Sequence, residues 1–146
     1  MQKTINLFVD MDGTIADFYG VEGWLDYLMA GDIYPYQAAK PLVNLSALAR
    51  QLHRLQRCGY EINIISWTSR GGSDFFNRRV ELAKKCWLMH HMPSVYFDHI
   101  HIIPYGTPKE NFGEGILFDD EQRNRENWCG VAYDVQNILE ILRELK

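Results

Sequence analysis

Short runs of bulky apolar residues recur along this chain and alternate with longer stretches in which apolar positions repeat every three or four residues. The short runs are typical of strands buried on both faces, and the longer stretches are typical of amphipathic helices. The alternation predicts an α/β fold, with a doubly wound, mostly parallel sheet of about five strands and about four main helices. The expected strands are residues 5–10, 61–67, 100–103, 116–118 and 131–133.

Capping residues and glycines indicate where the helices begin and end. Asn44 can cap a first helix that Gly59 ends. A second helix is predicted over residues 74–91, and a last amphipathic stretch covers residues 135–145. Residues 17–41 break the pattern with many aromatic residues and glycines, so we expect a small cap insertion above the sheet there.

Length and charge limit the classes of function. At 146 residues, we expect residues 1–146 to form one domain. The net charge is −4 and no block of lysine or arginine is present, which argues against binding of a nucleic acid polymer or an anionic membrane but leaves single nucleotides as ligands. The sequence gives no indication of oligomeric state.

Cellular location and cysteine chemistry can also be anticipated. Residues 1–6 lack the apolar stretch of a signal peptide, and no run reaches the length of about eighteen apolar residues that a membrane span needs. We therefore expect a cytoplasmic protein. Cys58, Cys86 and Cys129 lie far apart without metal-site spacing, so we expect reduced thiols in the core.

Two pairs of acidic residues follow apolar runs at opposite ends of the chain: Asp10 with Asp12, and Asp119 with Asp120. Ligands of open parallel sheets bind at the carboxyl ends of the strands, so the two pairs are expected to converge. Carboxylates at close range repel one another unless some are protonated or a cation lies among them. A bound divalent metal ion is the simplest way to accommodate all four.

Asp10 and Asp12 stand at positions i and i+2, so both can face one pocket where the chain turns at Gly13. One carboxylate can attack a phosphoryl group while the other transfers protons, which fits phosphoryl transfer in two steps. The simpler alternative is that this Asp-x-Asp-Gly stretch is only a turn.

Four short motifs follow one another in a fixed order. A buried strand ends in Asp10-Met-Asp-Gly-Thr14, a second strand ends at Thr68, Lys109 comes next, and an apolar run ends in Asp119-Asp120. This set resembles the haloacid dehalogenase superfamily over essentially the whole chain. The first motif through Phe18, the Trp-Thr-Ser segment around Thr68 and the spacing of Lys109 from Asp119 are similar to those of the 5'(3')-deoxyribonucleotidases.

The resemblance implies a magnesium-dependent phosphatase with the fold expected above. Asp10 would be the nucleophile and Asp12 the general acid and base. Mg²⁺ would be held by the Asp10 carboxylate, the Asp12 main-chain carbonyl and Asp119, with Asp120 as a further or water-mediated ligand. Oxygen-only ligands suit this ion.

The resemblance also assigns roles around the phosphate. Thr68 would donate its hydroxyl to a phosphoryl oxygen, and Lys109 would neutralise charge on the transferring group. Ser66 lies on the same face of its strand and is the alternative to Thr68. Lys109 could equally be a solvated lysine, and the acidic pair at residues 119–120 could cap a short helix.

Substrate recognition is less defined by the sequence. Phe18 matches a position whose ring stacks on the base in these nucleotidases, although the cap aromatics could instead form a small core of their own. Ser69 and Arg70 follow Thr68 and are further candidates for substrate binding, with bracing of the loop as the alternative for Arg70. The cap segment is shorter than in the deoxyribonucleotidases, so its other contacts cannot be matched.

The expected substrate is a small phosphate ester, first of all a nucleoside monophosphate. The protein would then be a 5'-nucleotidase or deoxyribonucleotidase that releases phosphate from it. A sugar phosphate or another small phosphate is the alternative within the same chemistry. A non-hydrolytic phospho-acceptor or binding module is the alternative of another class. In a receiver-like module the lysine comes late with no closing Asp-Asp, whereas here Lys109 precedes Asp119 and Asp120.

Overall fold

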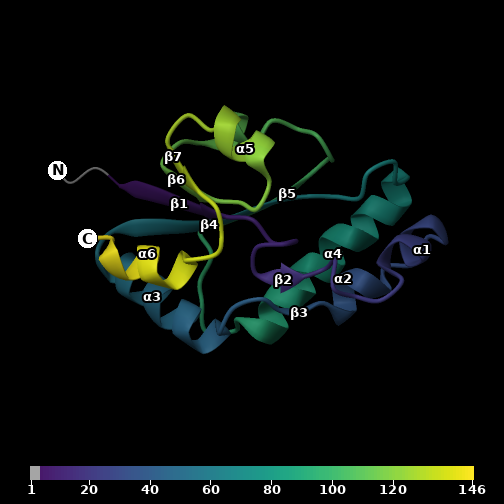
Figure 1. Cartoon of the computed structure of the whole chain (residues 1–146), viewed down its shortest axis with the longest axis horizontal. Helices are drawn as coiled ribbons and strands as arrows, with labels where there is room; N and C mark the ends of the chain where they lie inside the picture. Colours follow the sequence, from purple (N-terminus) through teal and green to yellow (C-terminus); the bar gives the residue numbers. More distant parts are fainter. Residues whose placement is uncertain (1–3) are drawn as a thin grey trace.

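A five-stranded parallel sheet forms the centre of the protein (Figure 1), as seen in a computed structural model that describes residues 4–146. Residues 1–3, part of the segment 1–6 that lacks the apolar stretch of a signal peptide, lie outside the described residues. The strands are β1 (Ile5–Val9), β4 (Tyr60–Trp67), β5 (His99–Ile103), β6 (Ile116–Phe118) and β7 (Val131–Tyr133). They lie in the order β5-β4-β1-β6-β7, and every neighbouring pair is parallel. The predicted α/β fold with a doubly wound sheet is confirmed.

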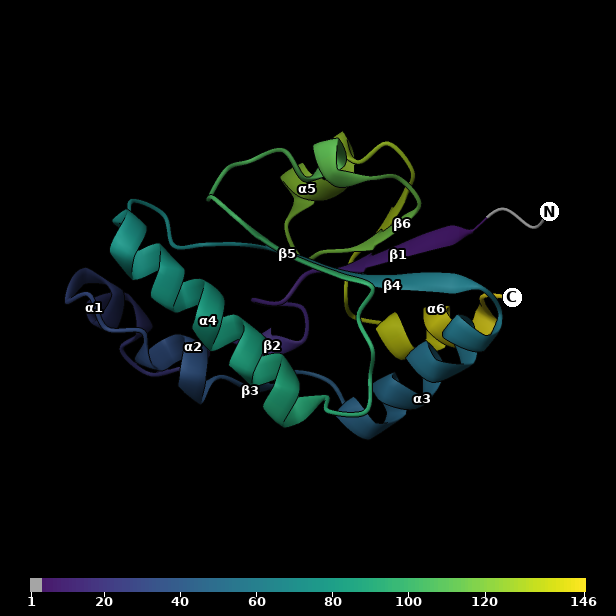
Figure 2. The same ribbon diagram turned by 180° about the vertical axis from the view of Figure 1, so that it is seen from behind.

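Helices cover both faces of this sheet (Figures 1 and 2). One face carries α3 (Leu45–Arg57), α4 (Asp74–His91) and α6 (Ile138–Glu144), and the other carries α5 (Gln122–Asn127). The Asn44 side chain accepts a hydrogen bond from the Ala47 amide and caps α3 as expected. A short 3₁₀ helix, η1 (Lys109–Phe112), connects β5 to β6.

The buried strands contribute alternate residues to two hydrophobic cores. In β1, Leu7 and Val9 pack under α3 and α6, whereas Phe8 packs with Leu117 and Trp128 on the opposite face. Because side chains alternate along a strand, a run of consecutive apolar residues fills both cores at once. Buried side chains therefore pack on both faces of the sheet, and this packing fixes the position of the residues that follow each strand at its carboxyl edge.

Residues 17–41, which we interpreted as a cap insertion, form a small layer along one side of α4 (Figures 1 and 2). Strands β2 (Ala16–Asp17) and β3 (Lys40–Pro41) pair antiparallel at its base, and the helices α1 (Trp24–Met29) and α2 (Tyr34–Ala38) lie between them. This layer packs on α4 through a cluster of buried side chains, comprising Phe18, Ile33, Tyr36, Phe76, Val80 and Ala83. The cap is thus anchored to the same helix that packs against the sheet.

The cysteines are free, as expected, but their predicted place in the core is wrong. Cys58, Cys86 and Cys129 are all exposed. Cys58 follows the end of α3, Cys86 lies on the outer face of α4, and Cys129 follows α5, so each stands beside the buried positions of its element. Within residues 4–146, none of the helices has the length and apolar character needed to cross a membrane.

Candidate active site

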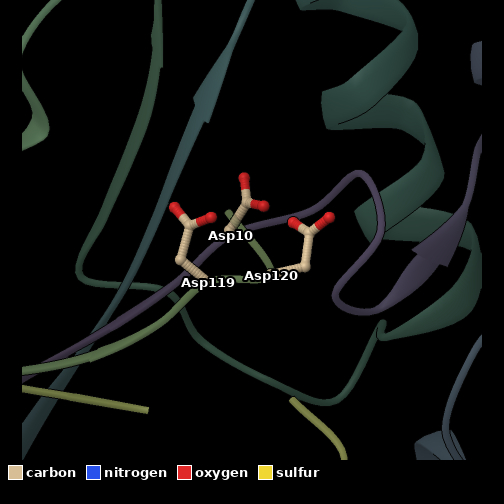
Figure 3. A group of neighbouring side chains, drawn as sticks. All are labelled: Asp10, Asp119 and Asp120. Atoms are coloured by element: carbon tan, nitrogen blue, oxygen red, sulfur yellow. The ribbon is translucent and has the colours of Figure 1, made fainter. Parts of the chain in front are cut away.

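The two acidic pairs meet at the carboxyl edge of the sheet, where β1 and β6 lie side by side. Asp10 follows β1, and Asp119 and Asp120 follow β6. From β1 the chain crosses to β4 on one side, whereas from β6 it crosses to β7 on the other side. Such a switch point opens a crevice above the strand ends, which is where open α/β sheets bind ligands. The three carboxyl groups rise into this space together (Figure 3).

Lys109 bridges the two acidic segments. Its ammonium nitrogen lies 3.0 Å from Asp10 Oδ1 and 2.6 Å from Asp119 Oδ2, and its side chain is only 2% exposed. Burial lowers the pKa of Lys109, but the charges of Asp10 and Asp119 outweigh burial, so its pKa is raised and the group stays protonated. The lysine lies at the start of η1, and it is not a solvated surface residue.

Asp119 is fully engaged by protein donors. Besides Lys109, the Asn124 side-chain amide donates to Oδ2 at 3.1 Å and the Glu121 amide donates to Oδ1 at 2.9 Å. Burial and the Asp10 charge raise the pKa of Asp119 to about 6, although Lys109 opposes them. With both oxygens hydrogen-bonded and no exposed surface, Asp119 is placed to hold Lys109.

Asp120 and Asp10 share a single hydroxyl donor. Thr14 Oγ1 lies 3.1 Å from Asp10 Oδ2 and 3.4 Å from Asp120 Oδ1, and one hydroxyl proton serves only one of them at a time. Burial and the charge of Asp10 raise the pKa of Asp120 to about 8. Asp10, Asp119 and Asp120 each offer a ligand oxygen within 4.8 Å of the others, which is a geometry that can hold a metal ion.

Gly13 makes room for this arrangement. Its φ is +79°, in the left-handed region that favours glycine, and a Cβ at this position would collide with the Asp120 carboxylate. The Asp-Gly pair is therefore a turn, as the simpler interpretation held, and the same turn brings the Asp10 and Asp120 carboxylates together.

Asp12 lies in the same loop but has a different partner. Its Oδ2 accepts a hydrogen bond from the ammonium of Lys84 at 2.8 Å, and its side chain is 20% exposed. Burial raises the pKa of Asp12, and the charge of Lys84 offsets this only in part. A carboxyl group whose pKa is raised holds a proton more readily, which suits a general acid.

Thr68 and Ser66 differ in their hydrogen bonding. Thr68 is 8% exposed, and its hydroxyl has no hydrogen-bond partner among residues 4–146. The hydroxyl of Ser66 accepts a hydrogen bond from Lys84 at 2.6 Å. A buried hydroxyl without a partner is costly, so of these two residues Thr68 is the one whose hydroxyl is free to bond a ligand oxygen.

A cavity of about 1120 Å³ opens above these groups and is lined by residues of the cap, the strand ends and α5. Trp24, Leu28 and Tyr36 line it on the cap side, and Tyr105 lines it from the loop after β5. The Arg70 guanidinium lies 5.9 Å from the centre of the Tyr105 ring. The cavity is large enough for a substrate that extends well beyond a phosphate group.

Phe18 and Ser69 also line the cavity. The Phe18 ring is 4% exposed and stacks on Tyr36 at 4.6 Å, so most of it belongs to the small core of the cap. Ser69 is buried directly after Thr68, and its amide donates to the side chain of Asn77. Stacking of Phe18 on a substrate base stays a prediction.

All the residues singled out in the sequence therefore gather around one cavity or beneath it, and sequence reasoning missed four more. Thr14 belongs to the first motif and Tyr36 to the aromatic residues of the cap, but neither had been given a role, and nothing in the local sequence distinguishes Asn124. Lys84 carried a signal, since it falls in the stripe of buried residues that α4 presents to the core: Val80, Ala83, Lys84, Trp87 and Leu88. A lysine in such a stripe indicates a buried partner.

Comparison of the chain with protein-family models and with curated proteins found no match. Function is therefore inferred from the fold and from the geometry of this site.

Proposed function

We propose that the protein is a magnesium-dependent phosphomonoester hydrolase that forms an aspartyl-phosphate at Asp10. One observation carries this proposal: the buried Asp10 carboxylate contacts the Lys109 ammonium at 3.0 Å and lines the same cavity as the acid–base candidate Asp12. The unpartnered hydroxyl of Thr68 lines the same cavity and offers a donor for a phosphoryl oxygen. A nucleophile, a proton donor and two groups for phosphate charge are thus brought together.

The residues present fit a magnesium ion. Asp10 and Asp120 are neighbouring carboxylates that share the Thr14 hydroxyl, and burial and the charge of Asp10 raise the pKa of Asp120, so a cation beside the pair would be favourable. Lys109 contacts two of the acidic side chains, Asp10 and Asp119, and Asn124 and a main-chain amide also donate to Asp119. Asp10, Asp119 and Asp120 each offer an oxygen to one ion, with the Asp12 carbonyl as the main-chain candidate. When bound, Mg²⁺ would allow an anionic nucleophile to approach an anionic phosphate.

The side chains would then carry the reaction in two steps. In the first, an Asp10 oxygen forms a bond to phosphorus while the phosphorus–ester oxygen bond breaks, and Asp12 gives its proton to the leaving oxygen. In the second, water attacks phosphorus, the bond to Asp10 breaks, and Asp12 takes the proton from the water. Lys109 and Thr68 stabilise the charge on the phosphoryl oxygens in both steps.

A nucleoside monophosphate is the substrate that we propose first. The cavity above Asp10 exposes Tyr19 and Tyr105, and aromatic surfaces suit a flat heterocycle. Arg70, beside Tyr105, adds positive charge to the same wall. The alternative within this chemistry is another small phosphate such as a sugar phosphate.

The sheet order argues against a receiver-like phospho-acceptor. Numbered along the chain, the five parallel strands lie in the order 3-2-1-4-5, whereas the receiver fold has the order 2-1-3-4-5.

Phosphate release from a panel of small esters tests the proposal. The panel holds deoxyribonucleoside and ribonucleoside monophosphates, sugar phosphates and p-nitrophenyl phosphate, each with Mg²⁺ and with excess chelator. We expect turnover that requires Mg²⁺ and is fastest on nucleotides. Preference for another ester would keep the chemistry and reject the nucleotidase assignment, whereas no release from any ester would reject the hydrolase.

The nucleophile is tested by Asp10→Asn. This variant keeps the size of the side chain and the fold, and we expect it to lose turnover. We also expect it to lose the labelling of the protein that radioactive substrate gives when the reaction is quenched in acid, which traps a transient aspartyl-phosphate. Asp17→Asn, in a half-buried position at the base of the cap, is the matched control and should keep both. Substantial turnover by Asp10→Asn would sink the assignment.

A further inference from the structure

Lys84 places a buried ammonium group next to the site, and the reaction outlined above gives it no role. The side chain is 1% exposed in the middle of α4. Its nitrogen donates to Asp12 Oδ2 at 2.8 Å, Ser66 Oγ at 2.6 Å and the Trp67 carbonyl at 2.6 Å. Three acceptors use all three N–H groups of a protonated lysine, so the ammonium has one fixed position.

The acceptors come from two segments that the reaction needs. Asp12 belongs to the loop after β1, whereas Ser66 and Trp67 are the last residues of β4 and directly precede Thr68. The β4 acceptors are 1% and 9% exposed and belong to a central strand, so they are the rigid side of the contact. Asp12, on a loop, is the group whose position the lysine decides.

The cap closes this contact from above. Tyr36 of α2 is 5% exposed, and the centre of its ring lies 5.3 Å from the Lys84 nitrogen. An aromatic face over an ammonium is favourable and excludes water that would compete for the Asp12 carboxylate. Removing the lysine would therefore leave Asp12 free to rotate and to take other partners.

Within the described part of the chain, the Lys84 ammonium donates a hydrogen bond to the Asp12 carboxyl group, and the acceptor is Oδ2. A proton on Asp12 must then reside on Oδ1. We propose that Lys84 is a positioning residue for the acid–base step: it holds Oδ2 so that Asp12 presents Oδ1, with its proton, to the leaving oxygen of the ester. This inference rests on the proposed function.

Leaving groups that differ in their need for a proton separate this role from a structural one. The rate of the first turnover of Lys84→Met is measured by rapid quench in Mg²⁺, with an alkyl phosphate and with p-nitrophenyl phosphate as the two substrates. An alkoxide leaves poorly unless it is protonated, whereas p-nitrophenolate leaves without a proton. We expect a loss of about 100-fold with the alkyl ester, the range of general acid catalysis, and a much smaller loss with p-nitrophenyl phosphate. Lys85→Met, which removes an exposed neighbour paired with Glu81, is the control and should match the wild type on both esters.

A double-mutant cycle completes the test. If Lys84 acts through Asp12, Lys84→Met should cost nothing further in an Asp12→Asn background. The double variant removes both charges of the buried pair, so it can fold even where Lys84→Met alone does not. Its first-turnover rate, compared with that of Asp12→Asn, then shows whether Lys84 acts through Asp12. An equal loss on both esters, or a further loss in the Asp12→Asn background, overturns the inference. A wild type without any phosphatase activity rejects the proposed function and the inference together, whereas an active wild type that Lys84→Met leaves unchanged rejects the inference alone.

Discussion

Lys109→Met is expected to destabilise the metal-free protein strongly, because it leaves two buried carboxylates without their shared ammonium. Asp10 and Asp119 are 8% and 1% exposed at the side chain, and the lysine lies 3.0 Å and 2.6 Å from them. Methionine is of similar length, so the change is mainly one of charge. Removing one partner of a buried ion pair costs about 3–5 kcal/mol. For a chain of this size, that lowers Tm by roughly 6–20 °C.

The loss should depend on pH in a defined direction. Burial already raises the pKa of Asp119 to about 6 with Lys109 in place, and without the lysine this pKa rises further. Between the unfolded and the folded pKa, the native state binds a proton that the unfolded state does not, so stability falls as pH increases. The variant should therefore be closest to the wild type at pH 5 and furthest from it at pH 8.

Urea unfolding in chelator, followed by circular dichroism at pH 5 and pH 8, measures both effects. Lys85→Met removes an exposed lysine that lies 3.8 Å from Glu81, and we expect it to stay within about 0.5 kcal/mol of the wild type. A loss for Lys109→Met below about 1 kcal/mol at pH 8, the size of an exposed pair, would refute the reasoning. So would a loss of equal size at the two pH values.

Three further expectations follow from the site. Thr68→Val should slow turnover and yet stabilise the metal-free protein by about 1 kcal/mol, because it removes a buried hydroxyl without a partner; a lower Tm would contradict this. Asp120→Asn should weaken Mg²⁺ binding at least tenfold by calorimetry, and unchanged affinity would exclude Asp120 as a ligand. Burial and the charge of Asp10 raise the pKa of Asp120 to about 8, so in chelator its ionisation lowers Tm as pH rises from 5 to 8, and the variant should show a smaller fall. Gly13→Ala should destabilise the protein by about 1–3 kcal/mol through its positive φ and the collision with Asp120, and a wild-type Tm would disprove that crowding.

The sheet and the acidic cluster could be predicted because both depend on a local pattern. Consecutive apolar residues identify strands buried on both faces, and the chemistry of an α/β fold concentrates at their carboxyl ends. The pairing of β2 with β3 could not be predicted, since each has two residues and one contains a proline. The helices α1 and α2 have only six and five residues, too few for a repeating apolar pattern to be recognised, so tertiary packing decides them.

The partners of the acidic residues illustrate the same limit. That Asp119 is saturated while Asp120 shares one hydroxyl with Asp10 depends on where Asn124 and Glu121 direct their donors, which no spacing reveals. Lys84 could have been found from its place in the buried stripe of α4. Its specific contact with Asp12 required the three-dimensional arrangement, because the two residues are 72 positions apart.

The adjacency of β1 and β6 also has a consequence for folding kinetics. The contacts that complete the site join residues at great separation along the chain, 99 positions for Lys109 with Asp10 and 106 for Thr14 with Asp120. Pairs this distant close the largest loops and form after the local contacts of α3 with β4. A nascent chain that has emerged only as far as β5 already carries Asp10, Asp12 and Thr68 but neither Lys109 nor the second acidic pair. On the ribosome, the acidic cluster would therefore assemble late, as a marker that β6 has joined β1 in the sheet.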